Sequence, residues 1–259
     1  MKKILAAILT GVMVFMTGCG SVAKNPVHGL SDLEGKKIGV QLKTTGDSYA
    51  TDIKDADVRR FNKGRDAVAA LRAGEIDAVM LDDAPAKVFV GEFGDIKILE
   101  EAYADEEYGI AVSKENPELL QKINEALEKL RSEGVIDRIV KAWIEGGETE
   151  SAYDGQTKES YGGGSLLIVT NAEFPPYEDQ LEDGTIVGID IDIMKAVCDK
   201  LDMKLQVEHT SFDSLIASVQ RGTADVAIAA MTITEDRLEQ VNFSDVYMSA
   251  KQVIIVRSK

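Results

Sequence analysis

The sequence has little of what catalytic and metal sites are usually built from. Its 259 residues include two histidines, two cysteines and one tryptophan, and His28 and His209 do not stand in a metal-ligand spacing. No phosphate-binding loop or nucleophile motif occurs either, so we expect no cofactor and no catalytic centre. Basic residues are also scarce: 29 lysines and arginines face 45 acidic residues, for a net charge of −16. That balance excludes nucleic acid as an expected partner.

The first residues have the pattern of an export signal. Lys2 and Lys3 precede an apolar run over residues 4–16, which is too short to span a bilayer. The run leads to Met16-Thr-Gly-Cys19, which resembles a bacterial lipobox with methionine in place of the usual leucine. We therefore expect residues 1–19 to be a lipoprotein signal peptide and lipobox, with lipid attached to Cys19. The alternative is an uncleaved signal anchor.

Proline is scarce as well, with five residues, and hydrophobic residues make up 44% of the chain. This composition is typical of a folded globular protein rather than a disordered one, and the length allows one large domain or two small ones. Cys198 is the second cysteine, and it lies on the apolar face of a predicted helix. With Cys19 lipidated, no disulfide within the chain is expected, and Cys198 is predicted to be a buried small side chain.

One sequence pattern occurs twice. Residues 66–77 and residues 214–225 each contain an apolar helix face, a glycine that ends the helix, and Gly-x-x-Asp leading into a buried strand. A strand, a loop and a helix also precede each copy. The repetition predicts two similar α/β lobes.

Other segments fit between and around these lobes. A crossing strand is expected at 108–112, and Asn116 and Pro117 are expected to begin an amphipathic helix that ends near Gly134. A second helix follows, with Trp143 on its apolar face. Residues 147–164 lose all periodicity and are rich in Glu, Ser, Thr and Gly, which is typical of a flexible linker. The last predicted strand covers 252–256.

Two short stretches carry the functional information. Thr170-Asn-Ala-Glu-Phe-Pro-Pro-Tyr177 and Ala229-Ala-Met-Thr-Ile-Thr-Glu-Asp-Arg237 each follow an apolar strand. Loops at the carboxyl ends of parallel strands are where open α/β sheets bind small ligands. Together they resemble the first lobe of the extracellular solute-binding proteins of family 3, which bind polar amino acids for ABC transporters. The resemblance implies a type II periplasmic-binding-protein fold, an α/β fold of two lobes around a ligand cleft.

The resemblance also implies an unusual chain order. In this family the first lobe opens the mature chain, whereas here the matching stretches come late. The strand at 253–257 resembles the first hinge strand, and the segment expected after it resembles residues 25–37. We therefore predict a circular permutation cut in the first hinge. The predicted division has four parts. The second lobe covers 20–105, and a crossing strand with helices that pack on the first lobe covers 106–146. A linker covers 147–164, and the first lobe, which ends in the hinge strand, covers 165–259.

The resemblance assigns partners to the charged ends of an amino acid. Arg237 offers a planar fork of donors to the ligand carboxylate, with Thr232 beside it and the Ala230 carbonyl facing the ammonium. The alternative interpretation of Arg237 is an arginine on the surface of a helix, with no role in binding. Thr44 and Thr45 resemble the family's Gly-Thr-Thr loop, which meets the carboxylate at a helix N-terminus.

In that loop Lys43 replaces the family glycine. If the position needs a positive φ, lysine costs about 1 kcal/mol of backbone strain. A cation beside the cleft also disfavours arginine or lysine as the ligand. Asp83 resembles the aspartate that pairs with the ligand ammonium, with Asp82 as the alternate candidate and helix capping as the structural alternative.

Three residues complete the predicted site. Phe174 and Phe212 match aromatic positions that enclose the ligand side chain, although isolated phenylalanines are more often core residues. Asn171 is expected to shape the side-chain pocket and, with Lys43, favours a polar or neutral amino acid.

The resulting hypothesis is a lipid-anchored extracytoplasmic receptor that delivers a free amino acid to an ABC transporter permease. The alternatives are a dehydratase-like enzyme on the same scaffold, a ligand sensor without transport, and a domain-swapped dimer in place of a monomer.

Overall fold

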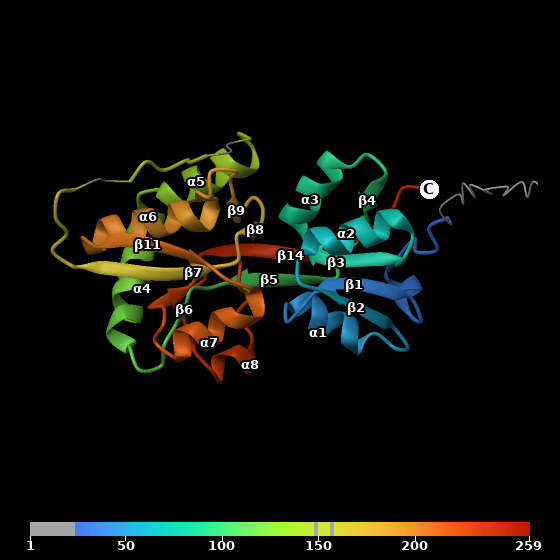
Figure 1. The fold of residues 1–259 in the computed structure, drawn as a ribbon, viewed down its shortest axis with the longest axis horizontal. Helices are drawn as coiled ribbons and strands as arrows, with labels where there is room; N and C mark the ends of the chain where they lie inside the picture. Colours follow the sequence, from blue (N-terminus) through green and yellow to red (C-terminus); the bar gives the residue numbers. More distant parts are fainter. Residues whose placement is uncertain (1–23, 148–149, 156–157) are drawn as a thin grey trace, which may run out of the picture.

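The computed structural model describes residues 24–147, 150–155 and 158–259. The predicted signal peptide and Cys19 lie outside these residues. Two lobes lie side by side, each built on a sheet with helices against it, and extended strands run between them (Figure 1). The predicted two-lobed α/β fold is confirmed. Within the described part of the chain, no helix combines the length and the hydropathy that crossing a membrane requires.

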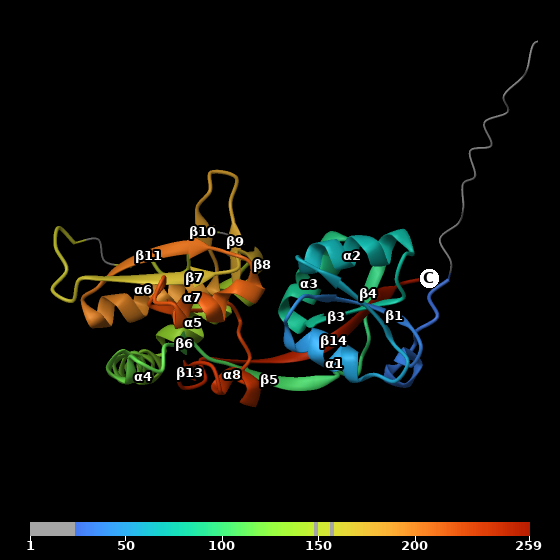
Figure 2. The same cartoon turned by 60° about the horizontal axis from the view of Figure 1, so that its bottom comes forward.

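The second lobe contains a sheet in the order β2-β1-β3-β14-β4. Its parallel strands β1, β2 and β3 alternate with helices, and β14 and β4 complete it in antiparallel pairing. Helix α1 covers one face, and α2 and α3 cover the other (Figures 1 and 2). The bounds are η1 Leu30–Leu33, β1 Lys37–Gln41, α1 Thr45–Asp52, β2 Asp57–Phe61, α2 Gly64–Ala73, β3 Ala78–Asp82, α3 Asp83–Glu92, β4 Ile96–Ile98 and β14 Met248–Arg257.

The first lobe contains a sheet in the order β11-β7-β12-β6-β13. Strands β11, β7 and β12 are parallel, and helices α4, α5 and α6 pack on one another beside them. A small sheet of β8, β9 and β10 lies next to the interface between the lobes (Figure 2). The bounds are β6 Ala111–Val112, α4 Pro117–Ser132, α5 Val135–Ile144, β7 Ser165–Thr170, β8 Glu173–Phe174, β9 Glu178–Gln180, β10 Ile186–Val187, α6 Ile189–Leu201, β11 Lys204–His209, η2 Phe212–Ser214, α7 Leu215–Gln220, β12 Val226–Ala227, α8 Glu235–Leu238 and β13 Asn242–Phe243.

The repeated Gly-x-x-Asp makes the same contact in both lobes. Gly74 and Gly222 adopt left-handed conformations, with φ of 77° and 67°, and end α2 and α7. The aspartate three residues later accepts a hydrogen bond from the first strand of its own lobe. Asp77 Oδ2 lies 3.0 Å from the Lys37 amide, and Asp225 Oδ2 lies 2.7 Å from the Leu167 amide. The sequence repeat therefore reflects a repeated βα unit.

Two strands cross between the lobes. Strand β5, Ala104–Tyr108, pairs antiparallel with the first half of β14, from Tyr108 opposite Met248 to Ala104 opposite Gln252. The second half of β14 then lies between β3 and β4 in the second lobe. This differs from the predicted division, which kept residues 165–259 in the first lobe. The apolar run at 253–256 is buried in the middle of the sheet of the second lobe, and this burial places the end of β14 in that lobe.

The two ends of the described chain meet at the far side of the second lobe. The Asn25 amide donates to the Lys259 carbonyl at 3.0 Å, and the Ser258 amide donates to Asp95 at 2.9 Å (Figure 1). The sequence prediction put this junction in the hinge. The structure instead leaves β14 continuous through the hinge, because its pairing with β5 and β3 extends over the whole strand.

The segment predicted to be a flexible linker docks on α6 where it is described. Ser151 Oγ and the Ala152 amide donate to the buried Asp192. Tyr153 donates to Asp199 at 2.9 Å. Further along, Lys158 Nζ and the Gly162 amide donate to Asp202 at 2.7 and 2.8 Å. Two aspartates of α6 and a third at its C-terminal end therefore hold this segment. The amino-acid composition of the segment did not predict these contacts.

Gly188 fixes the start of α6. Its φ is 138°, and a Cβ at this position would lie 2.0 Å from the Tyr177 carbonyl oxygen. We expect Gly188→Ala to lower the free energy of unfolding by more than about 3 kcal/mol, because both the backbone and the neighbouring carbonyl must move. Gly184→Ala is the matched control: φ is 89° there, but a Cβ meets nothing within 4 Å. It should cost about 1 kcal/mol in urea unfolding. Equal losses would contradict the steric argument.

Candidate functional site

A cavity lies between the lobes, and the space that its lining residues surround, part of it open to solvent, amounts to about 310 Å³. Each lobe contributes residues at the carboxyl ends of its parallel strands, as expected for open α/β sheets. The second lobe supplies Gln41, Thr44, Thr45 and Asp82, and the first lobe supplies Asn171, Phe174, Glu178, Phe212, Ala229, Ala230, Thr232 and Arg237.

Arg237 is a buried cation whose hydrogen bonds go only to carbonyls among the residues described. It belongs to α8, whose N-cap is Thr234, and its side chain enters the cavity. One guanidinium nitrogen donates to the Thr232 carbonyl at 2.7 Å, and another donates across the cleft to the Lys43 carbonyl at 3.1 Å. Burial lowers the pKa of Arg237, and the negative charges of Glu106 and Asp82 oppose that shift.

Asp82 is a buried carboxyl group that lines the same cavity. It accepts hydrogen bonds from Tyr108 and Gln252, and Gln252 also donates to Glu106 at 2.9 Å. Burial raises the pKa of Asp82 well above its usual value, and the neighbouring charge of Glu106 raises it further. No lysine or arginine of the described chain forms an ion pair with it. A cationic ligand group would therefore stabilise the ionised form of Asp82.

The structure places Asp82, the alternate candidate, in the cavity lining and not Asp83. Asp83 is the first residue of α3, outside the cavity lining. It pairs with Lys87 one turn later at 2.5 Å and accepts a hydrogen bond from the Lys251 amide. Strand β3 is buried along its whole length, including Asp82, and the helix starts directly after it. The strand therefore directs Asp82 inward, while the helix directs Asp83 outward.

Thr44 and Thr45 line the cavity at the start of α1, where the resemblance placed them. The Thr44 hydroxyl is already engaged within its own lobe: it donates to the Gln41 carbonyl at 2.8 Å and accepts from the Asp47 amide at 3.3 Å. Lys43 has a φ of 66°, so this position does adopt a left-handed conformation, here with lysine. That conformation costs lysine about 1 kcal/mol.

The Lys43 side chain does not enter this cavity. It is exposed and lines an outer groove between α1 and α7 instead, and only its carbonyl reaches Arg237. The sequence argument used its charge to disfavour a cationic ligand. Because exposed charge is screened by water, that argument loses its force here.

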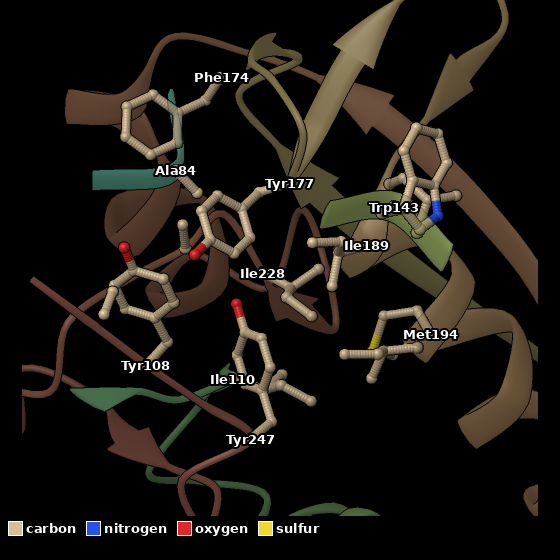
Figure 3. Close-up of a cluster of buried hydrophobic side chains, with 14 of the residues drawn as sticks. Ala84, Tyr108, Ile110, Trp143, Phe174, Tyr177, Ile189, Met194, Ile228 and Tyr247 are labelled. Carbon is tan, nitrogen blue, oxygen red and sulfur yellow. The ribbon is translucent and has the colours of Figure 1, made fainter. Parts of the chain in front are cut away.

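The aromatic residues lie on the first-lobe side of the cavity. Phe174 is buried and stacks on Tyr177, with ring centroids 6.2 Å apart. The Arg237 guanidinium lies over the ring of Phe212, with 5.4 Å between its central carbon and the ring centroid. Figure 3 shows Phe174 beside Tyr177, with Tyr108 and Tyr247 on the other side of the Tyr177 ring. Phe212 therefore contributes a π face to the arginine as well as a wall to the cavity.

Asn171 joins the lobes as well as lining the cavity. Its Oδ1 accepts from Gln41 Nε2 at 2.8 Å, and its amide nitrogen donates to the Thr210 carbonyl at 3.0 Å. Outside the cavity, Lys63 of the second lobe pairs with Glu173 of the first at 2.5 Å. With the Arg237 bond to Lys43, these contacts hold the described conformation closed around the cavity.

Sequence reasoning missed three residues of the lining: Gln41, Glu178 and Ala229. Gln41 ends β1, so its place at the carboxyl end of a parallel strand was the available signal. Ala229 is adjacent to the predicted Ala230. Glu178 is one acidic residue among 45, and nothing in its spacing distinguishes it from surface carboxylates. The other predicted residues, apart from Asp83, all line the cavity.

Residues 166–259 match the family model of the bacterial extracellular solute-binding proteins, family 3. The resemblance is confirmed over the first lobe. That segment contains β7, which precedes the Asn171 loop, as well as the Ala229–Arg237 loop and the crossing strand β14. The matched segment thus contains every residue that the first lobe contributes to the cavity lining.

Named relatives match parts of the chain. A probable histidine-binding protein of Neisseria gonorrhoeae is 34% identical over 111 residues, 41% of either chain. The arginine-binding extracellular protein of Bacillus subtilis is 36% identical over 35% of either chain. An L-cystine-binding protein of Escherichia coli is 30% identical over 44% of this chain and 43% of its own. The matches thus span well under half of each of these relatives.

Solved structures give partial matches as well. An ancestral arginine-binding protein bound to arginine is 47% identical over 32% of this chain and 36% of its own, with a TM-score of 0.31. Domain 1 of the T. maritima arginine-binding protein, in its arginine-bound form, is 38% identical over 37% of this chain and 81% of its own, with a TM-score of 0.32.

Proposed function

We propose that this chain is an extracytoplasmic receptor that binds a free amino acid between its lobes and delivers it to an ABC transporter. The observation that carries the proposal is the pair of opposite buried charges, Arg237 and Asp82, which line one cavity without pairing with each other. A free amino acid carries a carboxylate and an ammonium on one carbon, and so can satisfy both. The names of the relatives, for histidine, arginine and cystine, support the same class of ligand.

Closure of the lobes fits this role. Each charge comes from a different lobe, so a zwitterion gains both partners only in the closed state. Burial makes each contact stronger than in water, because the effective dielectric is lower. Ligand binding should therefore favour closure, and the closed form is what a transporter can distinguish from the empty one.

Isothermal titration calorimetry against the common amino acids and L-cystine tests the proposal. We expect at least one of them to bind with a Kd well below 1 mM, in a complex with one ligand per chain. Arg237→Ala should abolish this binding, because it removes the carboxylate partner and leaves Asp82 alone. Absence of binding by every amino acid at millimolar concentration would overturn the proposal.

Asp82 and Asp83 allow a matched pair of variants to be compared in the same titration. Asp82→Asn keeps the shape of the side chain and removes its charge, and should weaken binding about 30-fold or more, the loss expected for a buried charged partner. Asp83→Asn makes the same change one residue later, outside the cavity, and should change the Kd less than threefold. Equal effects of the two variants would contradict the assignment of Asp82.

An enzymatic role has one supporting observation. Glu178 is a buried carboxyl in the cavity lining, and burial raises its pKa well above the usual value, which favours the protonated form that a general acid needs. A dehydratase-like reaction needs such an acid. Mass spectrometry of the ligand after prolonged incubation with the protein separates the two roles: a receptor returns it unchanged, whereas an enzyme converts it.

We infer that the chain order is a circular permutation of the family order. In support, the family match begins at residue 166, and Asn25 lies within hydrogen-bond distance of Lys259. A rearranged chain that runs from residue 164 to 259 and then directly from 25 to 147 should fold to the same lobes. We expect its Kd to match that of the natural order within threefold and light scattering to give a monomer for both. Loss of folding in the rearranged chain would refute the permutation.

We also propose that the mature protein is lipid-anchored through Cys19. The lipobox-like sequence before that residue supports the assignment. Cells expressing the protein should incorporate a labelled fatty acid into it, and Cys19→Ser should lose the label. Cys198→Ser is the control, because Cys198 is buried in α6 and should not affect labelling. A label that survives in Cys19→Ser would contradict the anchor.

A further inference from the structure

The turn that faces the proposed ligand is held in an unfavourable backbone conformation. Ala230 lines the cavity and has a φ of 43°, in the left-handed region that residues with a side chain rarely occupy. Its amide donates to Asp190 Oδ2 at 2.8 Å. Asp190 comes from the first turn of α6, which is far from Ala230 in sequence. A long-range contact therefore fixes the local geometry of the ligand-facing turn.

Asp190 is fully buried and anchors a second group. The Tyr247 hydroxyl donates to the same oxygen at 2.9 Å. Figure 3 shows that Tyr247 and Tyr177 extend toward each other from opposite sides of this region. The other Asp190 oxygen, Oδ1, is buried and receives no donor from the described residues when all carboxyls are ionised.

Glu178 completes the arrangement. It lines the cavity, its side chain is buried, and both its carboxyl oxygens lack a donor when ionised. Glu178 and Asp190 are close enough to share a hydrogen bond, and a proton on Glu178 supplies it. Two ionised carboxylates in contact inside a protein repel each other strongly, so one proton on the pair removes the repulsion and satisfies Asp190 Oδ1.

We propose that Glu178 and Asp190 form a one-proton carboxyl pair that positions the Ala230 turn for the ligand, and that a second proton on the pair loosens this turn and weakens binding. Asp190 and Glu178 are thus positioning residues of the proposed amino-acid site, and the effect on affinity rests on that proposed function. With one proton, Asp190 is a carboxylate and its bonds to Ala230 and Tyr247 are charge-assisted. With two, it is a neutral acid, a weaker acceptor.

The sign of the pH effect follows from the charge of the pair. Burial raises the pKa of Asp190 to about 6, against the opposing effect of hydrogen bonds from Ala230, Glu178 and Tyr247. Because the ligand favours the form with Asp190 ionised, affinity should rise as the pH rises through that value. If only that form binds, the binding-competent fraction falls about tenfold between pH 7 and pH 5.

Other ionisable groups face the pair. Asp82 and Asp179 add negative charge near Glu178, and Tyr177 and Tyr247 lie against Asp190 with raised pKa values that keep them neutral. Asp82 also titrates near the ligand, so part of any pH dependence of affinity belongs to it. The test therefore needs a readout that is local to the Ala230 turn.

NMR of the ligand-free protein provides that readout. The Ala230 amide resonance should titrate with a midpoint near pH 6. In the double variant Glu178→Gln, Asp190→Asn it should stay constant from pH 5 to 7.5, because the amides keep the hydrogen bonds but carry no titrating proton. A flat Ala230 titration in the natural protein would overturn the proposal, and so would a double variant that titrates like it. Because no ligand is present, this arm does not depend on the receptor role.

Calorimetry with L-arginine, or with L-cystine if arginine does not bind, supplies the second arm. The natural protein should bind about tenfold more weakly at pH 5 than at pH 7, and the double variant should lose most of that difference. Asp190→Ala, which removes the anchor entirely, should bind weakly at both values. A double variant with the full natural pH dependence would assign the effect to Asp82 and overturn the link to the Ala230 turn. Should neither probe bind, the receptor proposal is in question, and the NMR result still decides the turn.

Discussion

The structure depends on keeping two buried opposite charges apart. Arg237 and Asp82 share one cavity, and each is satisfied by neutral groups of its own surroundings: carbonyls for the arginine, a tyrosine and a glutamine for the aspartate. If the two paired directly, the attraction would already be used and a zwitterion would have nothing to gain. The charges are carried by different lobes, Asp82 at the end of β3 and Arg237 on α8, and the rest of the fold holds the two lobes in place. The strand β14 is central to this, since it begins against β5 in the crossing and ends inside the second sheet.

Much of this arrangement was predictable, for identifiable reasons. The Gly-x-x-Asp repeat works as a predictor because its glycine needs a left-handed conformation and its aspartate needs a donor, and both requirements are local. The loops before Asn171 and Arg237 were recognisable because a strand end followed by small and polar residues restricts what the backbone can do. The confirmed family match covers these same residues.

The predictions that differ from the structure concern residues whose positions depend on packing against residues far away in the sequence. Asp82 and Asp83 are adjacent and identical in chemistry, and only the start of α3 determines which one points into the cavity. The segment predicted to be a linker is polar in composition, yet aspartates of α6 hold it, and no sequence period records contacts with a helix some forty residues away. Glu178 looks like any surface carboxylate until β9 buries it beside Asp190. In each case the missing information is the identity of the neighbour.

The docking of residues 150–155 and 158–163 on α6 has a thermodynamic consequence. A free tether between α5 and β7 would add the loop-closure entropy of its whole length to the cost of folding, and that cost grows with the logarithm of length. Contacts at Asp192, Asp199 and Asp202 hold the described parts of this segment against the helix. Each contact also orders backbone in the folded state, which costs conformational entropy that the hydrogen bonds must offset. Removing these aspartates would therefore return conformational freedom to the folded chain, and that gain would offset part of the free energy lost with the bonds.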